Sequence, residues 1–264
     1  MTSIERFDFH NPDEPGEEPL YDTLFDILSQ ALQPDAELSL GSAVEQLSAT
    51  IPSEQDHSSG MGTFLPTCYE LAAQIPYNHA SLVKVITIMD MVIASNAAVQ
   101  GRSDNRSFKY QTLSETLRDW WNSSDPSESP QHYISFQTFA AHVLSRGMGR
   151  GTHLAQWTLQ MAFEDRKKES MTPLYLEAYV MAASQWIVIY GEEIYRDAVA
   201  GGQGWFFKKS STDLTLKHWR RWKKDFRGVA GGKSRGGIDS GEECKRLAAS
   251  AAEAMDELEL KKGQ

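Results

Sequence analysis

The stretch of chain between two glutamates reads Ala178-Tyr-Val-Met-Ala-Ala-Ser-Gln-Trp-Ile-Val-Ile-Tyr-Gly191, without a charged residue. At helical spacing Trp186 shares one face with aromatic and small residues, and Val188 lies on the opposite face. A helix that is apolar almost all round is buried on all sides. The run is shorter than the roughly 20 apolar residues that cross a bilayer. We therefore predict a buried central helix over about 173–199, around which the rest of the chain packs.

Hydrophobic residues recur at helical spacing along most of the remaining chain, and no stretch has the alternating pattern of a strand or a hairpin. We therefore predict an all-α fold, either a multi-helical bundle or a short array of antiparallel helix pairs around the central helix. The other predicted helices cover residues 20–33, 42–49, 66–75, 82–98, 113–121, 134–146, 154–168, 212–227 and 242–260.

The charge is distributed unevenly. The whole chain carries −10, and residues 1–60 contain thirteen acidic residues and one basic residue, Arg6, so this segment carries −12 and the rest +2. Residues 1–19 are rich in proline and acid, which predicts a disordered acidic tail. Such a tail is expected to fold back weakly over a basic surface. Residues 20–260 predict a single all-helical domain with flexible linkers near 50–62, 123–131 and 228–241.

The predicted helix over 212–227 is sharply amphipathic. Trp219, Trp222 and Phe226 share one stripe, and basic residues occupy the far side. Interleaved basic and aromatic residues also occur in nucleic-acid binders. The separation onto two faces and the negative total favour a core-packed helix with a solvated basic face, which makes nucleic acid an unlikely partner. Our candidate binding residues here are Arg220, Arg221, Lys224 and Arg227, together with Trp205 in the preceding aromatic segment.

Signals for catalysis are weak. Gly231-Gly-Lys-Ser234 follows a predicted helix and lacks the spacing of a phosphate loop, so a linker is the better interpretation. Histidines and cysteines show no metal-ligand spacing. Glu164, Glu192 and Glu193 are the best acid candidates, because each follows an apolar stretch where burial can raise a carboxyl pKa. The favoured alternative is that Glu192 forms an ion pair or marks the solvent edge. We predict no catalytic residue, no metal and no cofactor.

Two further features concern location. Cys68 and Cys244 are far apart and match no redox pattern, which is typical of a reduced, intracellular protein. The N-terminus has no basic-then-apolar signal pattern. We predict a cytoplasmic or nuclear protein that does not enter a membrane; the oligomeric state is not indicated.

Two elements carry a resemblance to a known family. Trp186-Ile-Val-Ile-Tyr-Gly191-Glu192 is followed by Leu216-Lys-His-Trp219-Arg-Arg-Trp222-Lys-Lys-Asp-Phe226. With these elements the chain resembles an uncharacterised all-helical family of filamentous fungi, of the domain of unknown function 3632 type. The resemblance covers about 20–258 and is strongest over 136–226. It implies a fungal source and an all-α fold, and it brings no established activity, cofactor or catalytic residue.

Three functional classes stay open. The first is a non-catalytic, intracellular protein-interaction module whose protein partner is unknown. The second is a small-molecule-binding protein or enzyme with an aromatic pocket near Trp186 and Glu192. The third is a weak nucleic-acid binder that uses the basic helix 212–227. Because no catalytic motif survives comparison with its simpler structural explanation, we favour the first class.

Overall fold

The computed structural model describes residues 6–11, 18–51, 58–99, 110–149, 151–164, 172–201, 214–232 and 240–262. Every regular element in these ranges is an α-helix, which confirms the predicted all-α class. The chain divides into two compact units: residues 1–124 with 146–150, and residues 125–145 with 151–264. Each unit is described by itself below. The single domain over 20–260 stays a prediction.

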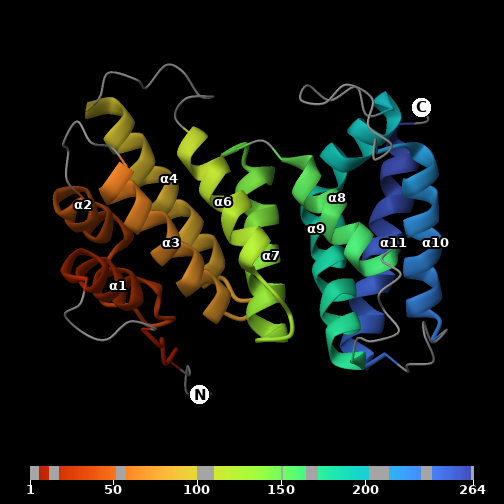
Figure 1. Ribbon diagram of the computed structural model, residues 1–264, viewed down its shortest axis with the longest axis horizontal. Coiled ribbons are helices and arrows are strands. Elements are labelled where there is room, and N and C mark those ends of the chain that lie inside the picture. The colour runs from red at the N-terminus through yellow and green to blue at the C-terminus, as the bar shows by residue number, and fades with distance from the viewer. Residues whose placement is uncertain are drawn as a thin grey trace. The chain divides into compact units, whose positions relative to one another are not determined.

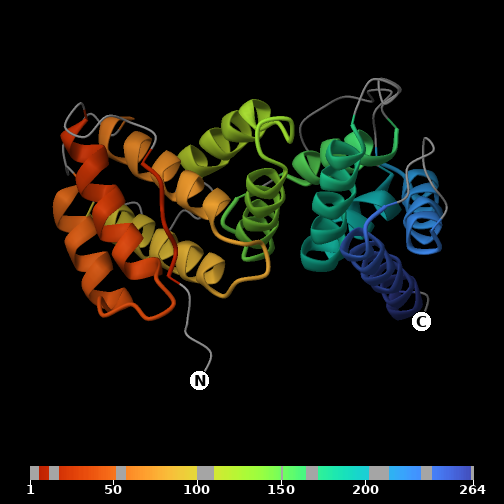
Figure 2. The same ribbon diagram turned by 90° about the horizontal axis from the view of Figure 1, so that it is seen from below.

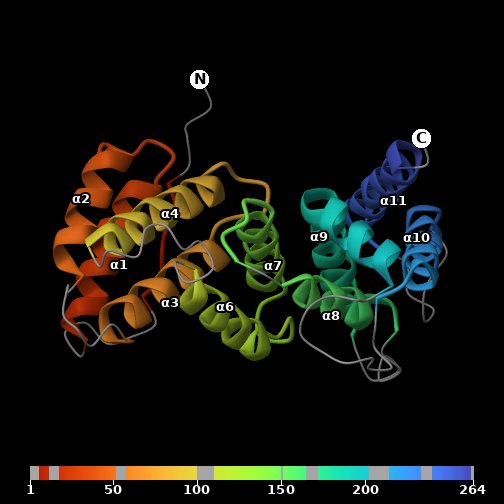
Figure 3. The ribbon, with the colours of Figure 1, turned by 90° about the horizontal axis from the view of Figure 1, so that it is seen from above.

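The first unit contains five helices among its described residues. They are α1 (Pro19–Leu32), α2 (Leu40–Thr50), α3 (Ser58–Gln74), α4 (Ser81–Val99) and α6 (Gln111–Ser123). Helix α1 packs against α2, α3 and α4, and α3 also contacts α6, as Figure 3 shows. Leu24 and Leu28 of α1 are fully buried, as are Phe64 and Tyr69 of α3. These side chains form the apolar core that holds the unit together.

The second unit is a bundle built on α9 (Pro173–Ala200). Its other helices are α7 (Pro130–Ser145), α8 (Thr152–Phe163), α10 (Leu216–Ala230) and α11 (Glu242–Lys262). Helix α9 contacts all four of them (Figure 1). A β-carbon on Gly191 would lie 3.2 Å from Leu258 Cδ1, so glycine at this position lets α11 approach α9 closely. The predicted central helix is therefore confirmed within this bundle.

The burial of α9 is less complete than its composition predicts. Trp186 and Ile194 are fully buried, but Val188 is 50% exposed. Burial on all sides is thus wrong at Val188. Leu174 and Val199 of α9 are exposed as well, so the helices that contact α9 leave part of its apolar surface to solvent. Scattered exposed apolar side chains are ordinary on a protein surface.

Several predicted boundaries also differ from the structure. Helix α7 begins at Pro130 and not at 134, so the last two residues of the predicted linker 123–131 are helical. Helix α3 begins at Ser58 and not at 66, with Pro66 inside it, so residues 58–62 are not a linker. The buried neighbours Phe64 and Leu65 explain this, because packing stabilises a helix more than local propensity does. Helix α10 begins at Leu216 and not at 212.

Helix α10 also ends later than predicted. Thr215 is its N-cap residue, and the Thr215 amide donates a hydrogen bond of 3.2 Å to His218 Nδ1. At the other end the helix continues to Ala230, three residues into the predicted linker 228–241, because Val229 is buried. Residues 233–239 of that linker lie outside the described ranges.

The described part of the predicted disordered tail is held by hydrogen bonds. Residues 6–11 lie against α1 and α3, where Gln33 and Gln74 bond to the backbone of Phe7 and His10. For these residues the structure shows defined contacts in place of disorder. Local composition cannot reveal them, because both glutamines are distant in sequence. These contacts lie within the first unit, and the expected folding of the tail over the basic helix stays a prediction.

Candidate interaction surface on helix α10

An apolar stripe fixes α10 against the rest of its unit. Trp219, Trp222 and Phe226 are all fully buried, as the sequence predicts. The Phe226 ring packs edge-on against Phe163 of α8 with centroids 4.6 Å apart, and Trp219 lies 5.0 Å from Tyr195 of α9. Aromatic pairs at these distances add to the stability gained from burial alone. The stripe therefore determines which side of α10 faces solvent.

Two carboxylates hold the buried indoles in place. Trp222 Nε1 donates a hydrogen bond of 2.7 Å to Glu164 Oε1 at the end of α8. Trp219 Nε1 donates one of 3.0 Å to Glu259 Oε1 of α11. A buried indole N–H needs an acceptor, and a charged acceptor makes the bond stronger. Glu164, an acid candidate in the sequence, thus has a structural partner.

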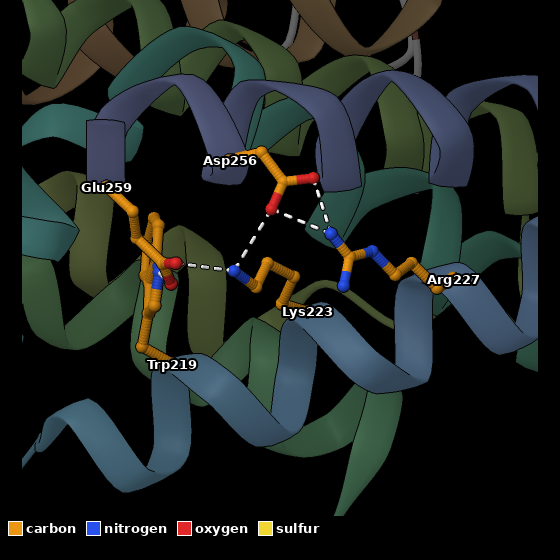
Figure 4. A network of polar contacts seen from close by, with 5 residues as sticks. All are labelled: Trp219, Lys223, Arg227, Asp256 and Glu259. Carbon is orange, nitrogen blue, oxygen red and sulfur yellow. Dashed lines mark hydrogen bonds and ion pairs between the residues drawn. The ribbon is translucent and has the colours of Figure 1, made fainter. Parts of the chain in front are cut away.

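An ion-pair network joins the flank of α10 to α11 (Figure 4). Lys223 Nζ lies 3.0 Å from Asp256 Oδ1 and 2.6 Å from Glu259 Oε2. Arg227 Nη2 lies 2.7 Å from Asp256 Oδ1. The Lys223 side chain is only 12% exposed, which protects its bonds from solvent screening better than those of a surface pair. The network therefore fastens α10 to α11 beside the aromatic stripe.

The pKa values of two members of this network, Lys223 and Asp256, favour their charged forms. Burial lowers the pKa of Lys223, but hydrogen bonds from its ammonium to Glu259 and Asp256 outweigh that effect and raise it above the ordinary value. Burial likewise raises the pKa of Asp256, but bonds from Lys223 and Arg227 outweigh it and lower the pKa below 3.8. A lowered carboxyl pKa gives stability that is lost as the pH falls through it. Lys223 and Asp256 are therefore both charged at neutral pH.

Replacing Lys223 by alanine should lower the free energy of unfolding by about 1–2 kcal/mol, because it leaves Asp256 and Glu259 with fewer partners. The matched control is Lys224→Ala on the next position of the same helix. Lys224 is exposed, and its loss should change stability by no more than about 0.5 kcal/mol. Urea denaturation at neutral pH measures both values. The difference between the stability losses of the two variants should shrink below about pH 4, where the carboxylates become protonated. Equal losses of the two variants at neutral pH would contradict the role of the network.

The exposed side of α10 carries cations that, unlike Lys223 and Arg227, are not paired with acids of α11 among the described residues. Lys217, Arg220 and Lys224 are exposed, and none of them pairs with an acid in the described part of the chain. They recur at helical positions i, i+3 and i+7, which places them on one line along the helix. We call these three residues the α10 crest. Arg221 borders the crest and lies 3.8 Å from Glu164 and 4.0 Å from Asp225.

The predicted binding residues on α10 fall into two groups. Arg220 and Lys224 belong to the crest, and Arg221 lies at its border. Arg227 is engaged by Asp256, so it serves the contact with α11. Trp205 lies outside the described residues.

Lys223 is the important residue that sequence reasoning missed. A signal for it exists in retrospect, because Lys223 and Arg227 are spaced i, i+4 on α10, and Asp256 and Glu259 are spaced i, i+3 on α11. Side chains at these spacings share one helix face.

Trp186 and Glu192 are not brought together by the structure. Trp186 is fully buried, and its indole Nε1 donates a hydrogen bond of 2.8 Å to Gln137 Oε1 of α7. Glu192 is exposed on α9. Six positions along a helix correspond to a rotation that separates the two side chains widely. Glu193, the neighbouring acid candidate, pairs with Arg196.

The environment of Trp186 is a buried polar cluster. Gln137 Oε1 accepts a second hydrogen bond, of 3.0 Å, from Thr158 of α8. Burial raises the pKa of Tyr133 well above its ordinary value and that of Tyr190 to about 12, so both phenols stay protonated at neutral pH. The cluster thus supplies hydrogen bonds between α7, α8 and α9. In the described ranges no group of three or more His, Cys, Asp or Glu side chains could hold a metal ion.

The chain matches the model of one protein family. Residues 66–226, more than half of the chain, match the family described as "Protein of unknown function (DUF3632)". The chain belongs to this family. The match runs from Pro66 inside α3 to Phe226 in the buried stripe of α10, so it includes α9 and most of α10. No curated protein and no solved structure matches the chain. Among the described helices, none combines the length and hydropathy that a membrane span requires.

Proposed function

We propose that this protein is a non-catalytic interaction module that binds an acidic segment of a partner protein through the α10 crest. The observation that carries the proposal is the contrast between neighbouring cations of one helix. Lys223 and Arg227 are engaged by acids of α11, and Lys217, Arg220 and Lys224 are exposed without an acidic partner among the described residues. An exposed row of cations on a rigidly held helix steers and orients an acidic partner.

The dimensions of the crest favour a peptide over a nucleic acid. From Lys217 to Lys224 the helix rises by about 10 Å. Acids border the crest on both sides, with Asp256 of α11 on one side and Asp225 on the other. Nucleic-acid binding without sequence preference draws its affinity from several neutralised phosphates along a continuous basic surface. A strip this narrow suits a short acidic helix or loop better.

We further propose that the interaction takes place in the cytoplasm or the nucleus. Cys68 and Cys244 are both free and buried. Burial raises the pKa of the Cys244 thiol to about 12, so it stays protonated and unreactive. Free thiols of this kind suit a reducing compartment.

Affinity capture with the purified full chain as bait tests the proposal. The bait is compared with the charge-reversal variant Arg220→Glu/Lys224→Glu, and each captured protein is then purified and its affinity measured at low and high salt. We expect a partner with an acidic segment whose affinity falls at least about tenfold with the variant, because like charges then face each other. The affinity for wild type should also fall with salt.

The matched control is Arg246→Glu/Lys261→Glu, which changes the net charge by the same amount at two exposed positions of α11. This variant should retain the partner. If a partner binds the crest variant and the α11 control equally well, or if both variants lose it, the crest is not its binding site. A metabolite that binds the purified chain and requires Glu192 would favour the small-molecule alternative.

A further inference from the structure

Two glutamines hold the N-terminal segment of the chain by its backbone. Gln33 Oε1 accepts a hydrogen bond of 2.8 Å from the Phe7 amide, and Gln33 Nε2 donates one of 3.1 Å to the Phe7 carbonyl. Gln74 does the same for His10, at 2.8 and 3.0 Å. A glutamine amide that contacts both groups of one residue reproduces the pairing between two antiparallel strands. These four bonds do not depend on the side chains of the bound segment.

The segment is extended and runs antiparallel to α1. Phe7 is bound at the C-terminal end of α1 by Gln33, and Asn11 Nδ2 donates a hydrogen bond of 3.1 Å to Asp22 in the first turn of α1. Eleven helical residues from Asp22 to Gln33 rise by about 16 Å. Four extended residues from Phe7 to Asn11 span about 13 Å, and side chains bridge the rest. Figure 2 shows the segment as a dark red trace beside the red α1 and the orange α3.

Side-chain contacts add selectivity to this arrangement. The Phe7 ring stands edge-on against His79, with centroids 4.8 Å apart, and Phe9 packs on Phe7 at 5.3 Å. Arg6 Nε lies 3.5 Å from Asp35. The bound pattern is therefore a base followed by phenylalanines at alternate positions.

Two of the receiving groups, Gln33 and His79, also form hydrogen bonds within the unit that do not involve the segment. Gln33 Nε2 also donates to the Ser29 carbonyl at 3.2 Å, which orients the amide. The Ser81 amide donates to His79 Nδ1 at 3.1 Å, which orients the ring. Ser81 Oγ and Lys84 Nζ bond the carbonyls of Leu32 and Gln33 at 2.7 and 2.9 Å. The part of the site formed by Gln33 and His79 is therefore pre-organised, so ordering it on binding costs little.

We propose that this surface, formed by Gln33, Gln74, His79 and the length of α1 between Asp22 and Gln33, is a peptide-binding site. Its ligand is an extended segment of a partner protein with a base followed by two phenylalanines at alternate positions. Residues 6–11 occupy the site as a tethered copy of that ligand. Main-chain hydrogen bonds supply affinity and the aromatic contact supplies selectivity, as in other sites that bind extended peptides.

The tether determines how a partner competes. A short tether raises the local concentration of the bound segment to the order of millimolar. The segment's polar contacts are exposed or part-buried, so its intrinsic affinity is modest. A partner segment of the same chemistry must therefore displace residues 6–11. Substitutions that weaken the binding of residues 6–11 should open the site.

The test uses the full chain and a fluorescent synthetic peptide with the sequence of residues 1–11. The site is opened in the variant Phe7→Ala/Phe9→Ala, and anisotropy measures peptide binding. We expect this variant to bind at least about tenfold more tightly than wild type, where the tethered segment competes. Adding Gln74→Leu should weaken binding by about tenfold, because two hydrogen bonds are lost at a position outside the core. A peptide with both phenylalanines replaced by alanine is the control and should not bind.

Each alternative result has a defined meaning. Equal binding to wild type and to the opened variant, or binding that ignores Gln74→Leu, overturns the proposal. Hydrogen exchange of wild type should show protected amides at Phe7 and His10, and unprotected amides overturn it as well. If wild type forms dimers that Phe7→Ala/Phe9→Ala dissolves, the occupant is the segment of a second copy and not a partner protein.

Discussion

Replacing Trp186 by alanine should lower the free energy of unfolding by about 3–5 kcal/mol. The side chain is fully buried on α9, the helix that contacts α7, α8, α10 and α11. Its removal leaves a cavity among packed helices and also deprives Gln137 of one of the donors to its carbonyl. Urea denaturation followed by far-UV circular dichroism measures the loss. A loss below about 1 kcal/mol would show that α9 does not organise its unit.

The variant Trp186→Phe separates the stability contribution of the Trp186 hydrogen bond from the contribution of burying its ring. Phenylalanine keeps most of the apolar contact but has no N–H to donate. Gln137 Nε2 already has no partner among the described groups, and Gln137 Oε1 would then keep only the bond from Thr158. We expect a loss of about 1–2 kcal/mol, because an imperfectly satisfied buried amide is costly. Combining Trp186→Phe with Gln137→Leu should restore part of this loss, since both polar partners are then removed together.

Local periodicity predicts that the helices exist and which of their faces are mostly buried, but it does not predict all of their boundaries. The stripe of Trp219, Trp222 and Phe226 repeats at helical spacing, and the structure buries all three. The uncharged run around Trp186 likewise predicts the central helix. Such patterns depend only on which side of one helix meets the core, and the sequence of that helix contains this information.

Contacts between distant segments could not be predicted in the same way. Gln137 and Trp186 are 49 residues apart, and Lys223 is 33 residues from Asp256. A polar residue contributes to the sequence pattern of a helix in the same way whether its side chain contacts solvent or a side chain of another helix. The bound segment 6–11 is the clearest case, because its acidic and proline-rich surroundings predict disorder and the groups that hold it come from α1 and α3.

Replacing Trp222 by alanine should also cost about 3–5 kcal/mol, and its effect should be centred on α10. Trp222 is fully buried and joins α10 to α8 through its bond to Glu164. Arg221→Ala is the matched control on the neighbouring position. Arg221 is exposed, and its ion pairs of 3.8 and 4.0 Å are long, so its loss should change stability by no more than about 0.5 kcal/mol. Chemical denaturation compares the two variants.

Hydrogen exchange of Trp222→Ala then shows how far the damage spreads. Amides of α10 should exchange faster than in wild type, because the helix has lost its anchor to α8. The proposed acidic partner should bind this variant more weakly, although every cation of the crest is unchanged, because the crest depends on α10 being held in place. Faster exchange in α1–α4 as well would mean that the two units unfold together as the single domain predicted from the sequence. Unchanged exchange in α10 itself would contradict the anchoring role of Trp222.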